Sequence, residues 1–192
     1  GIKYTVTEET YDEFTTTYEG ETGTIIEGAV SAKVTNSRKT GELDISKTVV
    51  SPIPAESTKS FTFTVTLENG EQKISGTYGE YTFDENGQAQ ITVNGGETAR
   101  IIGVPIGTTY RVVEAQDNDF EMTNNGQDSG EITTALSTAA FTNTRKTTEV
   151  SVEKIWDDND NKEKTRPESV KVQLKANGSN IGEEVELNEG NE

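Results

Sequence analysis

The chain has 192 residues, of which 30% are hydrophobic, and a formal net charge of −17 from 34 acidic and 17 basic side chains. This charge disfavours binding to nucleic acid and suits a soluble surface protein. The chain has no cysteine and no histidine, which excludes disulfides, thiol or histidine catalysis and the usual zinc ligands. We therefore expect no metal and no cofactor.

The apolar residues fall in short alternating runs rich in Val, Ile, Thr, Tyr and Phe, separated by Gly, Asn and Asp. This pattern is typical of an all-β protein and not of a disordered one. No apolar run is long enough to span a bilayer, and no signal peptide or lipidation motif is present. We expect any targeting information to lie outside this segment, and no membrane insertion within it.

A motif recurs at a spacing of domain size. The run Tyr4-Thr-Val-Thr-Glu8 corresponds to Tyr110-Arg-Val-Val-Glu114 (114 − 8 = 106), and Asn36 corresponds to Asn143 (143 − 36 = 107). A period of this length indicates repeated domains and not a solenoid. Residues 1–38 are therefore predicted to be the C-terminal part of one repeat, 41–145 a complete domain, and 149–192 the N-terminal part of a third.

The strand at 43–50 has a lysine where its alternation calls for an apolar residue. Leu43, Ile45, Lys47 and Val49 share one face of this strand, because successive side chains point to opposite sides. A lone ammonium on a buried face is costly. Lys47 either lies near a rim, where it can reach water, or is buried with partners that change its chemistry.

The rest of the middle domain reads as further short strands. Phe61, Phe63, Val65 and Leu67 form an inward row, and Asn-Gly turns separate the hairpins. The predicted strands lie near 43–50, 59–67, 72–76, 79–84, 88–93, 97–103, 108–115, 119–123 and 138–145. About 100 residues in so many short strands predict a two-sheet β-sandwich.

Two more polar residues occupy inward positions. Glu114 shares a face with Tyr110 and Val112, and Asn143 shares a face with Phe141. A single inward polar residue close to a sheet end is common. A lysine, a carboxyl and a carboxamide on three inward rows are complementary, and this favours a shared site.

These residues carry a family resemblance. The Lys47 strand, the Tyr-x-x-x-Glu run ending at Glu114 and the Phe-Thr-Asn-Thr-Arg run containing Asn143 resemble the B-type (CnaB-like) domains of collagen adhesins and related pilin domains of Gram-positive surface proteins. The resemblance covers nearly the whole chain, with 41–145 similar to the pilin type. It implies an immunoglobulin-like sandwich and a lysine–asparagine isopeptide bond between the first and last strands.

The chemistry of such a bond follows from the residue types. Lysine must be neutral to attack an amide, and burial disfavours the ammonium. A buried, protonated carboxyl can polarise the amide carbonyl and then pass its proton to the leaving ammonia. We expect Lys47 to be the nucleophile, Asn143 the electrophile and Glu114 the proton shuttle, in a reaction that happens once per molecule.

The two terminal segments are complementary. Residues 1–38 contain Glu8 and Asn36 without a lysine strand, and 149–192 contain Lys154, which follows Asn143 by the interval between Asn36 and Lys47 (154 − 143 = 47 − 36 = 11). One interpretation is head-to-tail association, with Lys154 of one chain meeting Glu8 and Asn36 of the next. The other is a piece whose ends fall out of phase with its repeats.

One stretch imitates a calcium loop. Asp157, Asn159, Asn161 and Glu168 have the spacing of ligands, but Lys162 stands where that motif needs glycine. A solvated acidic turn is the better interpretation.

Three function classes remain. The leading hypothesis is a non-enzymatic stalk or spacer module of a cell-wall-anchored, extracellular adhesin or pilus, whose partners are neighbouring repeats of the same protein. The alternative is an adhesin module that binds a host matrix protein or glycan. A hydrolase with paired carboxylates is the weakest, because the predicted neighbours of Glu114 are a lysine and an asparagine.

Overall fold

The computed structural model describes residues 1–176 and 178–188, and the chain divides into two units, Gly1–Lys146 and Thr147–Glu192. Positions 177 and 189–192, which belong to the predicted third repeat, lie outside the described residues. The described chain contains strands, turns and one short 3-10 helix. It has no helix long and apolar enough to cross a bilayer.

The first unit begins with two short antiparallel pairs. Strand β1 pairs with β3, and β2 pairs with β4. Their bounds are β1 Ile2–Thr5, β2 Phe14–Glu19, β3 Thr22–Ile25 and β4 Lys33–Arg38. A single residue, Lys39, separates β4 from the first strand of the sandwich that follows.

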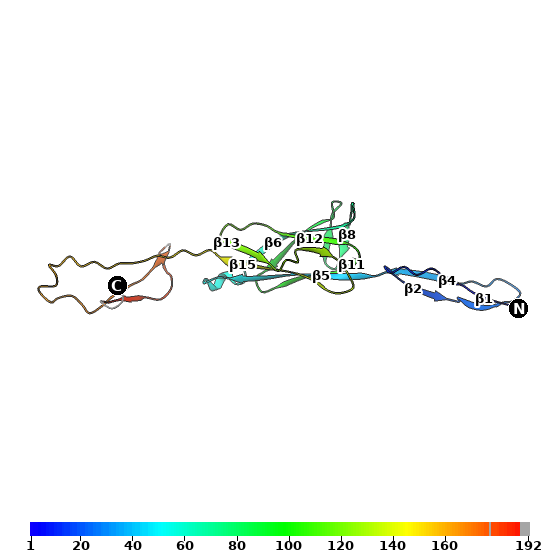
Figure 1. Cartoon of the computed structure of the whole chain (residues 1–192), viewed down its shortest axis with the longest axis horizontal. Helices are drawn as coiled ribbons and strands as arrows, with labels where there is room; N and C mark the ends of the chain where they lie inside the picture. The colour runs from blue at the N-terminus through cyan, green and yellow to red at the C-terminus, as the bar shows by residue number, and fades with distance from the viewer. Residues whose placement is uncertain (177, 189–192) are drawn as a thin grey trace. The chain divides into compact units, whose positions relative to one another are not determined.

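The middle of the chain is a sandwich of two sheets (Figure 1). One sheet has the strand order β10-β6-β12-β14, with β7 added to β6, and the other has the order β11-β5-β15-β13. The bounds are β5 Thr40–Val50, η1 Pro54–Glu56, β6 Ser60–Asn69, β7 Gln72–Lys73, β8 Gly76–Tyr78, β9 Tyr81–Phe83, β10 Gln88–Asn94, β11 Thr98–Pro105, β12 Thr109–Glu114, β13 Phe120–Asn124, β14 Ser129–Glu131 and β15 Ser137–Arg145. The predicted all-β, immunoglobulin-like sandwich is confirmed.

The inward rows of the two sheets form one core. Phe61, Phe63, Val65 and Leu67 of β6 are each at most 4% exposed, as the alternation of this strand predicts. Phe63 packs across the sandwich on Phe141 of β15, with the ring centroids 5.0 Å apart. Because side chains alternate between the two faces of a strand, the residues of β5, β12 and β15 that share a face with core residues also point inward.

The first and last strands of the sandwich are neighbours. β5 and β15 pair in parallel at the centre of their sheet, with Lys47 opposite Phe141 and Asn143 opposite Val49. Parallel strands cannot be joined by a tight hairpin. The other strands of the sandwich connect β5 to β15, and the pairing of these two strands brings the beginning and the end of the domain sequence side by side.

The observed strands differ from the predicted ones at three places. The strand expected over 72–76 is divided into β7 and β8, and Gly76 at the break has a φ of 128°, which favours glycine. The strand expected over 79–84 is shorter and forms β9 in a hairpin with β8. β14 was not predicted, because its sequence Ser-Gly-Glu is polar and exposed.

The second unit contains two small antiparallel pairs. β16 pairs with β19, and β17 pairs with β18. Their bounds are β16 Val170–Val172, β17 Lys175–Ala176, β18 Ser179–Asn180 and β19 Val185–Leu187. Residues 150–156, whose apolar residues alternate around Lys154 as those of β5 do around Lys47, form no strand. A strand needs a partner for its backbone groups, and this segment has none among the described residues.

Candidate functional site

Lys47 is buried in the core of the sandwich. Its side chain is 0% exposed, and it follows Leu43 and Ile45 on the inward face of β5, both also at 0%. The alternation of β5 puts the lysine in this row, and the flanking strands β11 and β15 cover both edges of β5. The lysine therefore does not reach water at a rim.

Glu114 of the opposite sheet is the partner of this lysine. Lys47 Nζ donates to Glu114 Oε2 at 2.7 Å, and the glutamate side chain is 2% exposed. Lys47 Nζ also lies 4.3 Å from the ring centroid of Phe61 and 5.9 Å from that of Phe63. The amine is thus enclosed by one carboxyl group and two aromatic rings.

Asn143 of β15 contacts the other oxygen of the same carboxyl group. Asn143 Nδ2 donates to Glu114 Oε1 at 2.5 Å, and the residue is 1% exposed. Within the described residues, the buried Asn143 Oδ1 has no hydrogen-bond partner. Glu114 therefore bridges the amine and the amide, and the amide oxygen is left unsatisfied.

The electrostatics of the site favour a neutral amine. Burial lowers the pKa of Lys47, while the hydrogen bond and the charge of Glu114 act in the opposite direction and are the smaller effects. Removal of water from an ammonium is costly because the low-dielectric interior solvates charge poorly. The neutral form of this lysine is therefore more accessible than that of a lysine in water.

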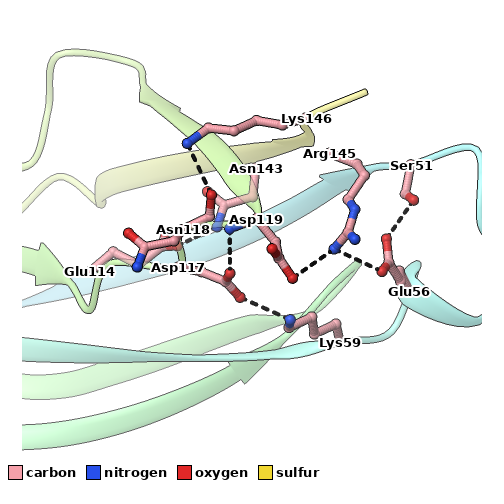
Figure 2. Close-up of polar contacts among 10 residues, drawn as sticks. All are labelled: Ser51, Glu56, Lys59, Glu114, Asp117, Asn118, Asp119, Asn143, Arg145 and Lys146. Atoms are coloured by element: carbon pink, nitrogen blue, oxygen red, sulfur yellow. Dashed lines mark hydrogen bonds and ion pairs between the residues drawn. The ribbon is translucent and has the colours of Figure 1, made fainter. Parts of the chain in front are cut away.

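A cluster of ion pairs lies at the end of the sandwich where β15 finishes, and Figure 2 shows it together with Glu114 and Asn143. Arg145 Nη1 lies 3.2 Å from Glu56 Oε1 and 3.0 Å from Asp119 Oδ2. Its guanidinium also stacks on Phe120, 5.4 Å from the ring centroid. The sequence pattern does not predict this cluster, because Glu56 lies in η1, Asp119 in the loop before β13 and Arg145 at the end of β15.

The cluster is joined to the aromatic side chains of the site. The rings of Phe120 and Phe61 meet edge to face, with centroids 5.6 Å apart, and Phe61 is the ring beside the Lys47 amine. Lys59 pairs with Asp117 at 2.8 Å. Lys59 and Arg145 thus lie over Phe120, whose ring contacts the Phe61 ring beside the Lys47 amine.

A second glutamate–asparagine pair lies in the N-terminal segment. Asn36 Nδ2 donates to Glu8 Oε1 at 2.6 Å, and Thr16 Oγ1 donates to Asn36 Oδ1 at 2.7 Å. Asn36 is exposed and Glu8 is half-buried. The structure therefore brings together two of the three residues predicted for the split site.

Lys154, the third residue predicted for the split site, makes contacts within its own segment. Lys154 Nζ donates to the carbonyl oxygen of Ile155 at 2.6 Å and lies 3.7 Å from the ring centroid of Trp156. It belongs to the second unit, and Glu8 and Asn36 belong to the first.

The calcium-like stretch is organised by an arginine. Arg166 binds both carboxylate oxygens of Asp158, at 2.7 Å and 2.5 Å, and this contact holds the pKa of Asp158 below its usual range. Residues 1–176 and 178–188 contain no group of three or more His, Cys, Asp or Glu side chains placed to hold a metal ion.

The segment that carries the site also carries the family match. Residues 41–145 match the family described as a domain of unknown function, DUF7601. The chain belongs to this family. Residues 150–192 match a second family, the Cna protein B-type domain, so the predicted resemblance to B-type domains is confirmed.

Similar proteins are pilus components. The pilus tip adhesin Cpa of Streptococcus pyogenes is 39% identical over 93 residues, which cover 46% of this chain and 13% of that protein. Two similar solved structures are a pilus-presented adhesin, Cpa (28% identity, TM-score 0.49, 55% of this chain and 27% of that one), and the major pilin T3.2 of Streptococcus pyogenes (19% identity, TM-score 0.47, 73% and 65%). The chain thus spans a small part of its curated relative.

Proposed function

We propose that residues 41–145 are a structural module of a Gram-positive cell-surface adhesin or pilus, and that this module cross-links itself through an isopeptide bond between Lys47 and Asn143. The observation that carries this proposal is the buried bridge in which Glu114 accepts from Lys47 Nζ at 2.7 Å and from Asn143 Nδ2 at 2.5 Å. A carboxyl group between an amine and an amide has the place that a proton shuttle requires.

The reaction starts with a proton transfer along the existing hydrogen bond. The Lys47 ammonium passes one proton to Glu114, which leaves an amine with a free electron pair and a protonated carboxyl. This neutral pair is the form that a water-excluded site favours over two charges. The aromatic rings of Phe61 and Phe63 around Nζ keep water from re-solvating the ammonium.

The unsatisfied oxygen of Asn143 supports the next step. The two orientations of a side-chain amide differ by a half-turn that exchanges its oxygen and nitrogen. When Glu114 is protonated, this half-turn gives Asn143 Oδ1 a hydrogen-bond donor, which it lacks among the described residues. The same hydrogen bond polarises the carbonyl and stabilises the negative charge that forms on its oxygen during attack.

The bond then forms with a complete balance of atoms. The Lys47 amine adds to Asn143 Cγ, the Cγ–Nδ2 bond breaks, and the nitrogen leaves as ammonia. Glu114 gives its proton to the leaving nitrogen and accepts one from the attacking nitrogen, so it ends protonated, with the one proton that the Lys47 ammonium gave up. No turnover follows, and the protein is not an enzyme towards other molecules.

The mechanical consequence supports a stalk or spacer role. Lys47 and Asn143 lie near the two ends of the sandwich sequence and on adjacent parallel strands. Tension that enters through β5 and leaves through β15 passes through the bond, and the 95 intervening residues (143 − 47 − 1 = 95) are shielded from it. In the full-length protein we place this module on the cell surface, anchored to the cell wall, with neighbouring repeats as partners.

A ligand-binding adhesin module is the alternative, with a host matrix protein or glycan as the partner. The exposed large hydrophobic residues of the middle domain are Val50, Ile53, Ile102, Val113, Met122 and Leu136, none of them aromatic. Recognition surfaces are enriched in aromatic anchors. This composition favours the spacer role for residues 41–145.

The test is a peptide map of the purified chain. Proteolysis followed by tandem mass spectrometry should give a branched peptide in which Lys47 is joined to Asn143. The Asn143→Ala chain should lack it. Recovery of separate, unmodified peptides containing Lys47 and Asn143 from the wild-type chain would contradict the proposed bond.

A further inference from the structure

The buried site lies next to an edge of the sandwich. β14 pairs only with the first half of β12, and its register ends with Ser129 opposite Arg111. Glu114 lies three residues further along (114 − 111 = 3), at the end of β12. In the other sheet, β13 is the edge strand and pairs with β15, which contains Asn143. Glu114 and Asn143 are therefore close to the side of the sandwich where β12 ends and β13 begins.

A hollow of about 320 Å³ lies at this edge. It is lined by residues from the end of β12, the loop that follows and β13, namely Glu114, Ala115, Gln116, Asp117, Phe120 and Met122. The side chain of Glu114 is only 2% exposed. The hollow thus reaches the residue that bridges the amine and the amide, while the carboxyl group itself stays shielded from water.

Met122 lies beside the Asn143 amide. The two residues are directly opposite each other in the register of β13 against β15. Directly opposite residues of an antiparallel pair point to the same face, with Cβ atoms about 4.5–5.5 Å apart. Asn143 points inward to Glu114, so Met122 points to the same side and covers the amide from the edge of the sandwich.

The side chain of Met122 is also open to reagents in solution. Met122 is 45% exposed, whereas Phe120, which shares its face of β13, is 4% exposed. The chain has one methionine and no cysteine, so its only sulfur atom lies at this edge. A thioether is apolar and flexible, and it fits irregular gaps. It is also the group that oxidants convert to a polar sulfoxide.

We propose that Met122 is the apolar cover of the Glu114–Asn143 pair and that its oxidation to the sulfoxide by a peroxide slows formation of the Lys47–Asn143 bond. This inference rests on the proposed function and adds a point of regulation to the same site. The sulfur takes one oxygen from the peroxide as the O–O bond breaks, and the other oxygen leaves as water with both protons. The sulfur is oxidised and the peroxide is reduced.

The sulfoxide disfavours the reactive form of the site. Its oxygen is a polar acceptor that keeps water or another donor beside it. Water at this edge stabilises the charged pair of Lys47 ammonium and Glu114 carboxylate. The bond forms from the neutral pair, which a dry site favours over two charges. Oxidation therefore lowers the fraction of chains that are ready to react.

The sulfoxide oxygen also competes for the proton of Glu114. In the proposed reaction the protonated carboxyl group donates to Asn143 Oδ1, which lacks a partner among the described residues. A second acceptor beside this carboxyl group takes the hydrogen bond in part of the molecules. The Asn143 carbonyl is then less polarised, and the charge that forms on its oxygen during attack is less well stabilised.

The test compares chains that differ only in the oxidation state of this sulfur. Chains assembled by chemical synthesis carry methionine or methionine sulfoxide at position 122 and are unbonded in denaturant. Dilution starts folding, acid stops the reaction, and the intact mass gives the fraction that has lost ammonia. Circular dichroism of parallel samples measures folding. The sulfoxide chain should fold and lose ammonia several-fold more slowly than the methionine chain.

Two variants at the same position separate polarity from shape. Met122→Leu keeps an apolar cover without sulfur and should react as fast as the wild type. Met122→Gln has a polar side chain of similar length and should react several-fold more slowly. Met122→Gln also decides the question if circular dichroism shows that the sulfoxide chain does not fold.

The control for the sulfoxide group is a second exposed position. Leu136 is 50% exposed and belongs to a different hollow, with Thr40 and Gly103. The double variant Met122→Leu, Leu136→Met with the sulfoxide at position 136 should react as fast as the wild type. Peroxide treatment of the folded wild-type chain should add one oxygen to the peptide that contains Met122, and none to the same peptide of Met122→Leu.

The outcomes separate this proposal from the proposed function. Equal rates of ammonia loss for the methionine, sulfoxide and Met122→Gln chains overturn the role of Met122 and leave the Lys47–Asn143 bond intact. Met122→Leu that is as slow as Met122→Gln overturns it as well, because an apolar cover is then not sufficient. A folded chain that gains no oxygen at Met122 overturns its oxidation. A wild-type chain that never loses ammonia overturns the proposed function, and this inference with it.

Discussion

Lys47 and Glu114 are 67 positions apart in the sequence, and their side chains form a 2.7 Å contact in the interior of the sandwich, where they are 0% and 2% exposed. The two residues belong to different sheets, so the contact crosses the core. A buried lysine is rare unless it is paired. Here the partner also accepts a hydrogen bond from the Asn143 amide, so one carboxyl group contacts both side chains of the proposed bond.

Replacement of Glu114 by glutamine should prevent bond formation. Glutamine has nearly the shape of glutamate but cannot accept and return a proton, so the shuttle is lost. The intact mass of Glu114→Gln should show no loss of ammonia. Glu121→Gln, a substitution at an exposed position of β13, is the matched control and should react as the wild type does. Ammonia loss in Glu114→Gln would remove this glutamate from the mechanism.

Replacement of Lys47 by methionine should lower the free energy of unfolding. Methionine fills much of the space of lysine, so the main effect is loss of the cross-link. Closing a loop of this length contributes about 4–5 kcal/mol in the chain-entropy estimate. Urea unfolding should measure the difference, with Lys73→Met at an exposed position as the control. Equal unfolding free energies for Lys47→Met and the wild type would contradict a stabilising bond.

Lys47 should contribute a rise in the stability of the unbonded domain as the pH rises towards 10.5. Burial lowers the pKa of Lys47 from its ordinary value of 10.5. Between the lowered value and 10.5, the unfolded chain binds more protons at this lysine than the folded chain does, so the free energy of unfolding rises with pH. Asn143→Ala, which keeps Lys47 and Glu114 but cannot form the bond, is the variant to measure.

The control for this pH dependence is the double variant Lys47→Met, Asn143→Ala. Its unfolding free energy should lack the rise that Lys47 produces, and the other titratable groups should contribute equally to both curves. Curves that run parallel across this range would show that Lys47 has the same proton affinity in the folded and unfolded states.

Loss of the Arg145 guanidinium should loosen the end of β15. Arg145 contacts Glu56, Asp119 and the ring of Phe120, and it is partly exposed, so we expect Arg145→Gln to cost on the order of 1 kcal/mol. The amide of Lys146, which donates to the Asp119 carbonyl at 2.9 Å, should exchange its hydrogen several-fold faster.

The matched control is Arg111→Gln, at an exposed position of β12, and it should leave the exchange of the Lys146 amide unchanged. If Arg145→Gln also leaves it unchanged, the ion pairs do not hold the end of this strand.

The alternation of apolar residues predicted the inward side chains because one face of each sheet is buried and the period of a strand is two. It placed Lys47, Glu114 and Asn143 on inward rows, and all three are buried. The family resemblance, and not the alternation, suggested a bond between them. The bond stays a proposal.

Features that depend on partners could not be read from the sequence. The segment from Val150 to Trp156 has the alternation of β5 but forms no strand, because a strand is stable only when another strand satisfies its backbone. The bidentate contact between Arg100 and the outward-facing Asp44, at 2.7 Å for both bonds, depends on the register of β11 against β5. The sequence pattern does not specify that register.

The intact mass of the purified wild-type chain tests the central claim most directly. The monomer mass should be lower by one ammonia than the mass calculated from the sequence, and Lys47→Ala should have its full calculated mass. A wild-type chain with the full calculated mass would show that Lys47 and Asn143 remain unbonded and would contradict the account.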